Sequence, residues 1–241
     1  MITSSSNTQV KRVIQLSRKA RERKKQQIFV VEGRKMFQEA PREWLEQVYV
    51  TENFEIEHKN VLDGIDYEVV DERIFTQMSD TQTPQGILCL VKMPVYTLDE
   101  VLKGDNPLCV ILEDLQDPGN VGTIFRTAEG AGVTGILLSR NTVDLFNPKT
   151  IRSTMGSIYR MPFLYVEDLC EILPELEKRS IHTYAAHLRG ENAYDCEDYR
   201  RGTAFFIGNE GNGVSRLVKE KCDFTTAIPM KGDIDSLNAS V

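Results

Sequence analysis

The sequence predicts an α/β fold in two parts, a small N-terminal domain and a larger C-terminal domain with a mainly parallel sheet. Amphipathic helix patterns alternate with short apolar runs through most of the 241 residues, as in sheets covered by helices. Pro94, Gly104 and mixed polar residues interrupt the alternation, as interdomain linkers do. We therefore expect four segments: a basic N-terminal segment (1–25), a small α/β domain (26–92), a linker (93–106) and the larger domain (107–241).

The composition is that of an ordinary globular protein. Hydrophobic residues make up 41% and charged residues 27% of the chain, and no run approaches the ~18 apolar residues of a membrane-spanning helix. No signal peptide is recognised. The five cysteines have no metal-ligand spacing, so we assign no metal site and expect a reducing, cytoplasmic environment. Three histidines match no motif and are interpreted as structural or surface residues: His58, His182 and His187.

The charge is distributed unevenly. Residues 1–35 contain ten lysines and arginines against two glutamates, a balance of +8, which leaves −15 for the remainder of a chain whose net charge is −7. A basic segment on an acidic protein is typical of contact with a polyanion such as RNA. The alternative is a solvated, poorly ordered arm, and composition alone does not separate the two.

In the N-terminal part, helix and strand patterns follow one another closely. Val10, Val13 and Ile14 recur at helical spacing after cap candidates at 4–7, whereas the basic run Arg21–Lys25 looks like a loop. The further patterns predict helices at 34–40 and 72–78 and strands at 28–31, 47–50, 67–70 and 85–91.

The same alternation resumes beyond the linker, which itself contains a short helix pattern at 98–102. Asn147 and Pro148 cap a helix with proline at its first position. The further patterns predict helices at 120–131 and 167–178 and strands at 108–112, 135–138, 181–186, 203–207 and 224–228. A mainly parallel sheet binds its ligands at the carboxyl ends of its strands.

Three loops each follow a predicted strand and precede a helix pattern. The first, 114–126, has Asn120 at or beside the helix N-cap and Arg126 off the apolar stripe. The second is the glycine-rich GNEGNG at 208–213, and the third is 228–241, where Asp235 or Ser236 is a candidate N-cap. Because such loops leave a parallel sheet at one edge, they predict a common binding site.

Taken singly, each loop has a simpler interpretation. Asn120 can be a plain helix cap, Arg126 a surface charge, and the GNEGNG run a flexible turn. The glycines are not followed by Gly-Lys-Ser/Thr, which excludes a P-loop. Gly119 and Gly122 do not give G-x-G-x-x-G either, so a nucleotide-binding enzyme of Rossmann type is not supported.

Together the three loops resemble the motifs of the SpoU/TrmH family of RNA ribose 2′-O-methyltransferases, within the SPOUT class. The motifs are DPGNVGxxxR at 117–126, FIGNEGxG at 206–213 and IPMxGxxxSLNxS at 228–240. This resemblance covers the chain from about Pro107 onward. The stretch from VKRVIQL to IFVVEGR is similar, less specifically, to the RNA-binding substrate domain of many such enzymes, a fold related to ribosomal RNA-binding proteins.

The resemblance implies a trefoil knot in the C-terminal part, bound S-adenosyl-L-methionine, and a homodimer with active sites at its interface. Members usually continue past the third motif with a helix that closes the cofactor site. Because the sequence reaches only Val241, we expect this helix to be cut short. Carried over by position, the cofactor-binding residues are Gly208, Ile228 and Leu237, and the residues of the catalytic site are Asn120, Arg126, Glu210, Ser236 and Asn238.

The implied reaction is methyl transfer to a ribose 2′-hydroxyl of structured RNA and needs no metal. Ribosomal RNA is the favoured substrate, and transfer RNA is the alternative. Arg126 is the family's candidate for activating that hydroxyl. Because an arginine rarely gives up its proton, we expect it to stabilise the developing alkoxide and the adjacent phosphate rather than act as a general base. Two alternatives remain: a non-catalytic RNA-binding protein on the same fold, which the joint presence of Asn120, Arg126 and Asn238 disfavours, and a SPOUT enzyme that methylates a base nitrogen.

Overall fold

The computed structural model describes residues 1–232 and 236–241 and divides into two compact units. Unit 1 comprises Met1–Pro94 and Asp144–Tyr159, and unit 2 comprises Val95–Val143 and Arg160–Val241. The α/β fold class is confirmed in both. The segment 144–159 lies in sequence between strands of unit 2 but packs within unit 1, and nothing in its local pattern predicts this.

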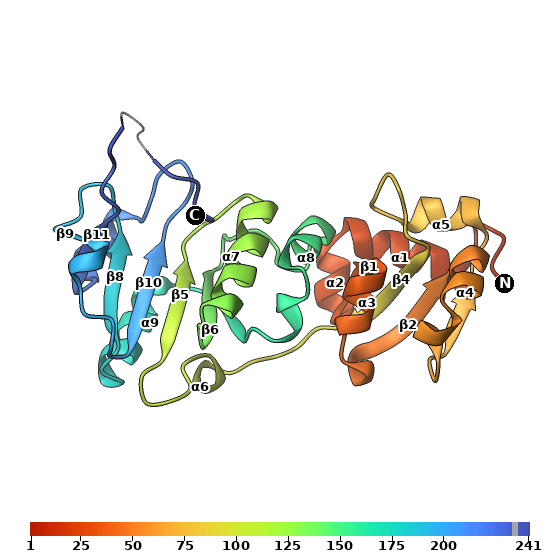
Figure 1. The fold of residues 1–241 in the computed structure, drawn as a ribbon, viewed down its shortest axis with the longest axis horizontal. Coiled ribbons are helices and arrows are strands. Elements are labelled where there is room, and N and C mark those ends of the chain that lie inside the picture. The colour runs from red at the N-terminus through yellow and green to blue at the C-terminus, as the bar shows by residue number, and fades with distance from the viewer. Residues whose placement is uncertain (233–235) are drawn as a thin grey trace. The chain divides into compact units, whose positions relative to one another are not determined.

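Unit 1 is built on a four-stranded mixed sheet of order β1-β4-β2-β3 (Figure 1). β4 is antiparallel to β1 and β2, whereas β2 and β3 are parallel. The strands are β1 (Ile28–Glu32), β2 (Leu45–Val50), β3 (Tyr67–Val69) and β4 (Ile87–Lys92), and the helices that follow them in sequence are α3 (Arg34–Glu39), α4 (Glu52–Glu57) and α5 (Glu72–Met78).

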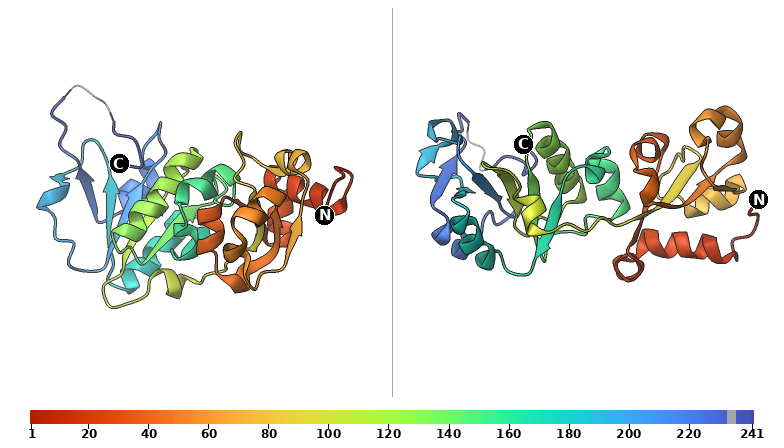
Figure 2. Two further views of the ribbon diagram at one scale, coloured as in Figure 1. Left: turned by 45° about the vertical axis from the view of Figure 1, so that its right-hand side comes forward. Right: turned by 90° about the horizontal axis from the view of Figure 1, so that it is seen from below.

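The basic N-terminal residues form two helices of unit 1. α1 (Thr8–Arg18) buries Val10, Val13 and Leu16 in the core and lies along one face of the sheet (Figure 2). α2 (Ala20–Gln26) occupies the run Arg21–Lys25, so the expected loop there is wrong. The pattern failed because the inward-facing residue of α2 is Arg23, which is 2% exposed, rather than an apolar side chain.

An ion pair holds the segment 144–159 in unit 1. The Arg23 guanidinium donates to the Asp144 carboxylate from Nη2 at 2.5 Å and from Nε at 3.2 Å, and its Nη1 donates to the Leu16 carbonyl at 2.6 Å. α8 (Pro148–Thr154) then runs beside β1 (Figures 1 and 2). The Tyr159 hydroxyl closes the segment by donating to the Met36 carbonyl at 3.0 Å.

Unit 2 is built on a seven-stranded sheet of order β7-β6-β5-β10-β8-β11-β9, in which all paired strands are parallel. The parallel sheet expected from the sequence is confirmed. Its strands are β5 (Leu108–Leu112), β6 (Gly135–Ser139), β7 (Phe163–Val166), β8 (His182–Ala186), β9 (Asn192–Ala193), β10 (Thr203–Ile207) and β11 (Phe224–Ala227).

Helices cover both faces of this sheet. α6 (Leu98–Val101), α9 (Leu169–Lys178) and α10 (Arg216–Lys221) share one core with Ile111, Ala204 and Phe206. α7 (Pro118–Gly130) lies on the opposite face (Figure 1), where its Phe125 packs against Phe163. α7 begins two residues earlier than expected, because Asp117 is the N-cap and Pro118 fits the first helical turn.

The third motif forms no helix among its described residues. After β11, Ile228 and Pro229 have no regular secondary structure, and among residues 236–241 a turn lies at Ala239 and Ser240. The helix expected to start at Ser236 is therefore absent from this part, and the alternative cap Asp235 lies outside the described residues. Asn238 caps the turn locally, since its Oδ1 accepts from the Ser240 N–H at 2.8 Å and the Val241 N–H donates to its carbonyl at 2.9 Å.

The trefoil knot stays a prediction.

Within the described ranges, every helix is too short or too polar to span a bilayer.

Asp144→Ala should destabilise unit 1 by about 3 kcal/mol, because it leaves the buried Arg23 guanidinium without its counter-charge. Urea unfolding followed by fluorescence of Trp44, the single tryptophan of the chain, reports on this unit. The matched control is Asp80→Ala, which removes the more exposed ion pair with Arg152 and should cost less than about 1 kcal/mol. Equal losses in both variants would contradict the anchoring role of the Arg23–Asp144 pair.

Candidate active site

Two of the three predicted loops leave adjacent strands at the same level. β5 and β10 are parallel neighbours, and Leu112 pairs with Ile207 at their carboxyl ends. The Glu113 N–H donates to the Ile207 carbonyl at 2.9 Å, one residue beyond the ladder. The third loop follows β11, which β8 separates from β10. The sheet therefore brings the first two loops together directly.

Glu210 joins the second loop to the first. Its carboxylate accepts three hydrogen bonds, each at 3.1 Å, from the backbone N–H groups of Gln116 and Asp117 and from Asn120 Nδ2. Partial burial alone would raise the pKa of this carboxyl, but these bonds and one from its own backbone N–H outweigh burial and hold the pKa below its ordinary value. Glu210 is thus an ionised clamp on the start of α7.

Asn120 sits in the first turn of α7. Its backbone N–H donates to the Asp117 carboxylate at 2.9 Å, and its side-chain amide donates to Glu210. Asp117, not Asn120, is the helix cap. This leaves the Asn120 side chain available for a contact across the loops, and the structure brings the predicted residues Asn120 and Glu210 together.

Gly208 permits a close passage of the chain. A Cβ atom at this position would lie 2.0 Å from the carbonyl carbon of Gly213 and 2.0 Å from the nitrogen of Val214. Asn209 holds the loop in this shape, because its Oδ1 accepts from the N–H groups of Gly211 and Asn212 at 3.0 and 3.1 Å. The second loop (208–213) is therefore a compact backbone turn that excludes a side chain at Gly208.

Arg126 lies on the exposed face of α7. It is six residues beyond Asn120, which places it about 9 Å along the helix axis and about 120° around it. No hydrogen bond or ion pair involves its guanidinium among residues 1–232 and 236–241. The structure therefore does not bring Arg126 to the Asn120–Glu210 contact within one copy of the chain.

The predicted site residues of the third motif expose their side chains. Ile228 is 51% and Leu237 is 38% exposed, and Ser236 and Asn238 are exposed as well. Within the described part of the chain, no hydrogen bond links 236–241 to the first two loops. Within the described part of the chain, one hydrogen bond joins two of the eight predicted residues, from Asn120 to Glu210.

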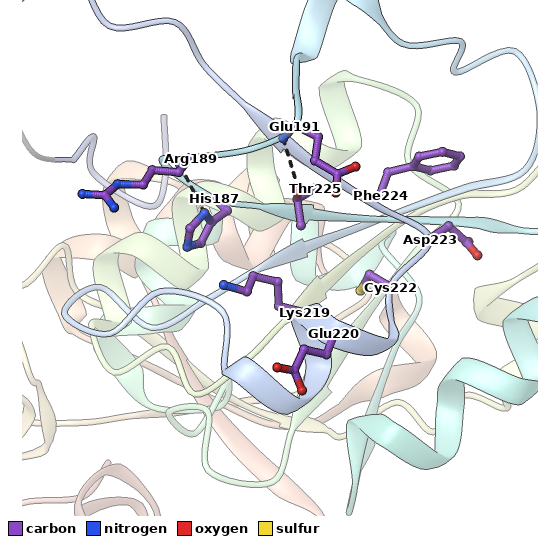
Figure 3. A pocket seen from close by; sticks show the side chains of 9 residues that line it. All are labelled: His187, Arg189, Glu191, Lys219, Glu220, Cys222, Asp223, Phe224 and Thr225. Atoms are coloured by element: carbon purple, nitrogen blue, oxygen red, sulfur yellow. Dashed lines mark hydrogen bonds between the residues drawn. The ribbon is translucent and has the colours of Figure 1, made fainter.

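A pocket of unit 2 lies elsewhere. It measures about 370 Å³ and is lined by residues of the β8–β9 connection, α10 and the start of β11 (Figure 3). The Arg189 N–H donates to His187 Nδ1 at 3.1 Å, and the Glu191 N–H donates to Thr225 Oγ1 at 3.1 Å across it. None of the eight predicted residues lines this cavity. In the part of the chain that the structure describes, no group of three or more His, Cys, Asp or Glu side chains is placed to hold a metal ion.

Two residues that hold the site were missed by the sequence analysis. Asp117 caps α7, and Asn209 connects the loops, since its Nδ2 donates to the Asp114 carbonyl at 2.8 Å. The signals were present. Asp before Pro is a common helix start, and Asn in a glycine-rich turn commonly bonds to the backbone two residues ahead.

Family comparisons match both parts of the chain. Residues 107–241 match the SpoU rRNA Methylase family, and residues 7–89 match the MRM3-like substrate binding domain. The first match spans the strands and loops that carry all eight predicted residues.

Individual proteins of known name are similar over nearly the whole chain. The 23S rRNA (guanosine(2553)-2′-O)-methyltransferase RlmP of Bacillus subtilis is 31% identical over 100% of this chain and 94% of its own length. The crystal structure of the SpoU methyltransferase AviRb from Streptomyces viridochromogenes in complex with AdoMet has a TM-score of 0.87 and 25% identity, covering 97% of this chain and 93% of that one.

A third similar structure is the AdoMet-bound rRNA methyltransferase from Sinorhizobium meliloti, with a TM-score of 0.86 and 26% identity over 99% of this chain and 92% of that one. The non-catalytic alternative is therefore not supported. Motif, fold and relatives agree that this chain belongs to the SpoU rRNA methylase family of RNA 2′-O-methyltransferases.

Proposed function

We propose that the protein transfers a methyl group from S-adenosylmethionine to a ribose 2′-hydroxyl of 23S ribosomal RNA. The observation that carries this proposal is the Glu210 clamp, which joins the first two motif loops at the carboxyl edge of the parallel sheet. The relative RlmP, whose name states this reaction, is similar over the full chain. Transfer RNA is the competing substrate, and the assay below includes it.

The second and third loops fit the cofactor through their backbone. Gly208 has no side chain, so its surface is open to a ligand on the side away from Gly213. Ile228 and Leu237 expose apolar surface that a bound nucleoside could cover. Bound S-adenosylmethionine supplies an activated methyl group on a sulfonium, so the leaving group departs neutral. The residues of the chain then have to orient the ribose and stabilise the charge on its 2′-oxygen.

The polar residues of the site would have different roles in orienting the ribose and stabilising this charge. Arg126, with its exposed guanidinium, would stabilise the developing alkoxide and the neighbouring phosphate. Ser236 and Asn238 would orient the ribose by hydrogen bonds. Because three N–H donors already occupy the Glu210 carboxylate, we assign it the role of holding Asn120 and the loop rather than of abstracting a proton.

A homodimer would complete the site. Arg126 faces away from the Asn120–Glu210 contact on its own helix, by the helical geometry given above. A second copy that supplies its Arg126 to this site would place an arginine beside the Asn120–Glu210 contact. This assembly agrees with the homodimer expected from the resemblance.

RNA binding is assigned to unit 1. Arg21, Lys24 and Lys25 are exposed at i, i+3 and i+4 on α2 and form its basic stripe. Charges in such an array bind phosphates without reading sequence. Because α1 and the buried Arg23 belong to the core of unit 1, this role has to be tested by point substitution rather than by deletion of residues 1–25.

Arg126→Ala should lower the rate of methyl transfer at least about a hundredfold, because the charge that stabilises the alkoxide is lost. The assay follows labelled methyl groups from S-adenosylmethionine into unmodified 23S rRNA and tRNA transcripts. Cofactor affinity should stay within about twofold, and Arg140→Ala, which removes an exposed arginine paired with Glu167, should retain the rate. Substantial activity in Arg126→Lys would indicate that positive charge suffices. Wild-type turnover in Arg126→Ala would refute the proposed role.

Gly208→Ala should weaken cofactor binding about tenfold or more, the equivalent of about 1.4 kcal/mol, because the added methyl group forces the 208–214 turn open. Isothermal titration calorimetry with S-adenosylmethionine measures the change. The control is Gly211→Ala in the same loop, where the nearest atom to a new Cβ is Asn209 Oδ1 at 3.5 Å. Equal affinities in the two variants would contradict the assignment of this turn to the cofactor.

Replacing Arg21, Lys24 and Lys25 with glutamine should reduce the slope of log K against log salt for RNA binding by about two to three. Three exposed cations elsewhere in unit 1, Lys59, Arg73 and Lys92, provide the matched control and should leave the slope nearly unchanged. The slope is measured by fluorescence anisotropy with a labelled rRNA fragment. An unchanged slope in the first variant would show that α2 does not contact the RNA.

A further inference from the structure

The loop between β5 and α7 is held from two sides. On the β10 side, Asn209 and Glu210 of the second motif bond to its backbone. On the β6 side, the Val143 N–H donates to the Leu115 carbonyl at 2.8 Å, and side chains of residues that belong to no motif approach Asp114. The second set has no assigned role.

Asp114 is the residue at which the chain turns from strand to helix. Its φ is +56°, in the left-handed region that side chains other than glycine, asparagine and aspartate rarely adopt. Only two residues separate it from the helix cap Asp117. Such backbone conformations persist where the surroundings hold them in place, and a small change in this φ would swing the whole of α7.

Ser139 bonds to Asp114 at its backbone N–H and at its carboxylate. At the end of β6, its Oγ accepts the Asp114 N–H at 2.8 Å and donates to the Asp114 carboxylate at 2.6 Å. Ser139 is 7% exposed and Thr142, whose Oγ1 lies 3.0 Å from Ser139 Oγ, is 5% exposed. Water is therefore a poor substitute for either hydroxyl. The other side-chain donor to this carboxylate, Asn141 Nδ2 at 3.4 Å, is longer.

We infer that Ser139 is a positioning residue for methyl transfer, acting through Asp114. By fixing the left-handed turn, it sets the direction in which α7 leaves the sheet and hence where Asn120 and Arg126 lie. Asp114 and Ser139 touch neither cofactor nor RNA in this scheme. The inference rests on the proposed function of Arg126, and the experiment separates the two.

The test is a double-mutant cycle in single-turnover methyl transfer from labelled S-adenosylmethionine to the unmodified 23S rRNA transcript. Ser139→Ala should lower the rate at saturating cofactor by about tenfold to a hundredfold, the effect of a small misplacement of reacting groups. Cofactor affinity should stay within about twofold, and the assay is run well below the melting temperature of each variant. In an Asp114→Gly background, where glycine adopts the turn freely, Ser139→Ala should have no further effect.

The matched control is Thr134→Val. The Thr134 hydroxyl donates to the Leu108 carbonyl at 2.9 Å, at the amino end of the same strand pair, so its loss should change stability but not the rate. A wild-type rate in Ser139→Ala would overturn the inference, and so would an equal loss of rate when Ser139→Ala is added to Asp114→Gly. If Arg126→Ala is inactive in the same assay, the proposed function still stands. A fully active Arg126→Ala would instead refute the proposed function.

Discussion

The candidate site depends on the parallel pairing of β5 with β10. These strands are separated by about ninety residues of chain, yet their carboxyl ends finish level, with Leu112 opposite Ile207. Because of this register, the loops that follow emerge side by side, and Glu210 can reach the backbone N–H groups that precede α7. A shift of one residue would turn the side chains of β10 to the other face of the sheet and would remove the clamp on α7. The position of Asn120 follows from the same register.

Local sequence patterns predicted the alternation of strands and helices and the parallel sheet, because both depend on short-range apolar periodicity. They failed where a polar residue takes a core position. The buried face of α2 contains Arg23, whose charge is satisfied by Asp144 and two main-chain carbonyls, and so the run looked like a loop. The packing of residues 144–159 in unit 1 has the same origin, since its anchor is a contact between residues more than a hundred positions apart.

The site was predictable in outline and not in its contacts. Motif order suggested the candidate residues, but the bond from Asn120 to Glu210 depends on strand register. The 120° between Asn120 and Arg126 follows from both residues lying inside α7. The bonds that fix Asp114 come from Ser139 at the end of a neighbouring strand, which carries no motif. These restraints favour a preorganised first loop, in which the chemistry requires little rearrangement of the protein. The third loop differs, because the side chains of its four predicted residues are exposed and the hydrogen bonds of its described residues stay within 236–241.

Methylation of ribose at this sheet edge can be tested by locating the transferred methyl group within the nucleoside. The full chain is incubated with S-adenosylmethionine carrying an isotopically labelled methyl group and, in separate reactions, with the unmodified 23S rRNA and tRNA transcripts. The RNA is then digested to nucleosides and analysed by mass spectrometry. We expect a single 2′-O-methylated nucleoside with the label on the ribose fragment. Label on the base fragment, or no transfer to either ribosomal or transfer RNA, would contradict it.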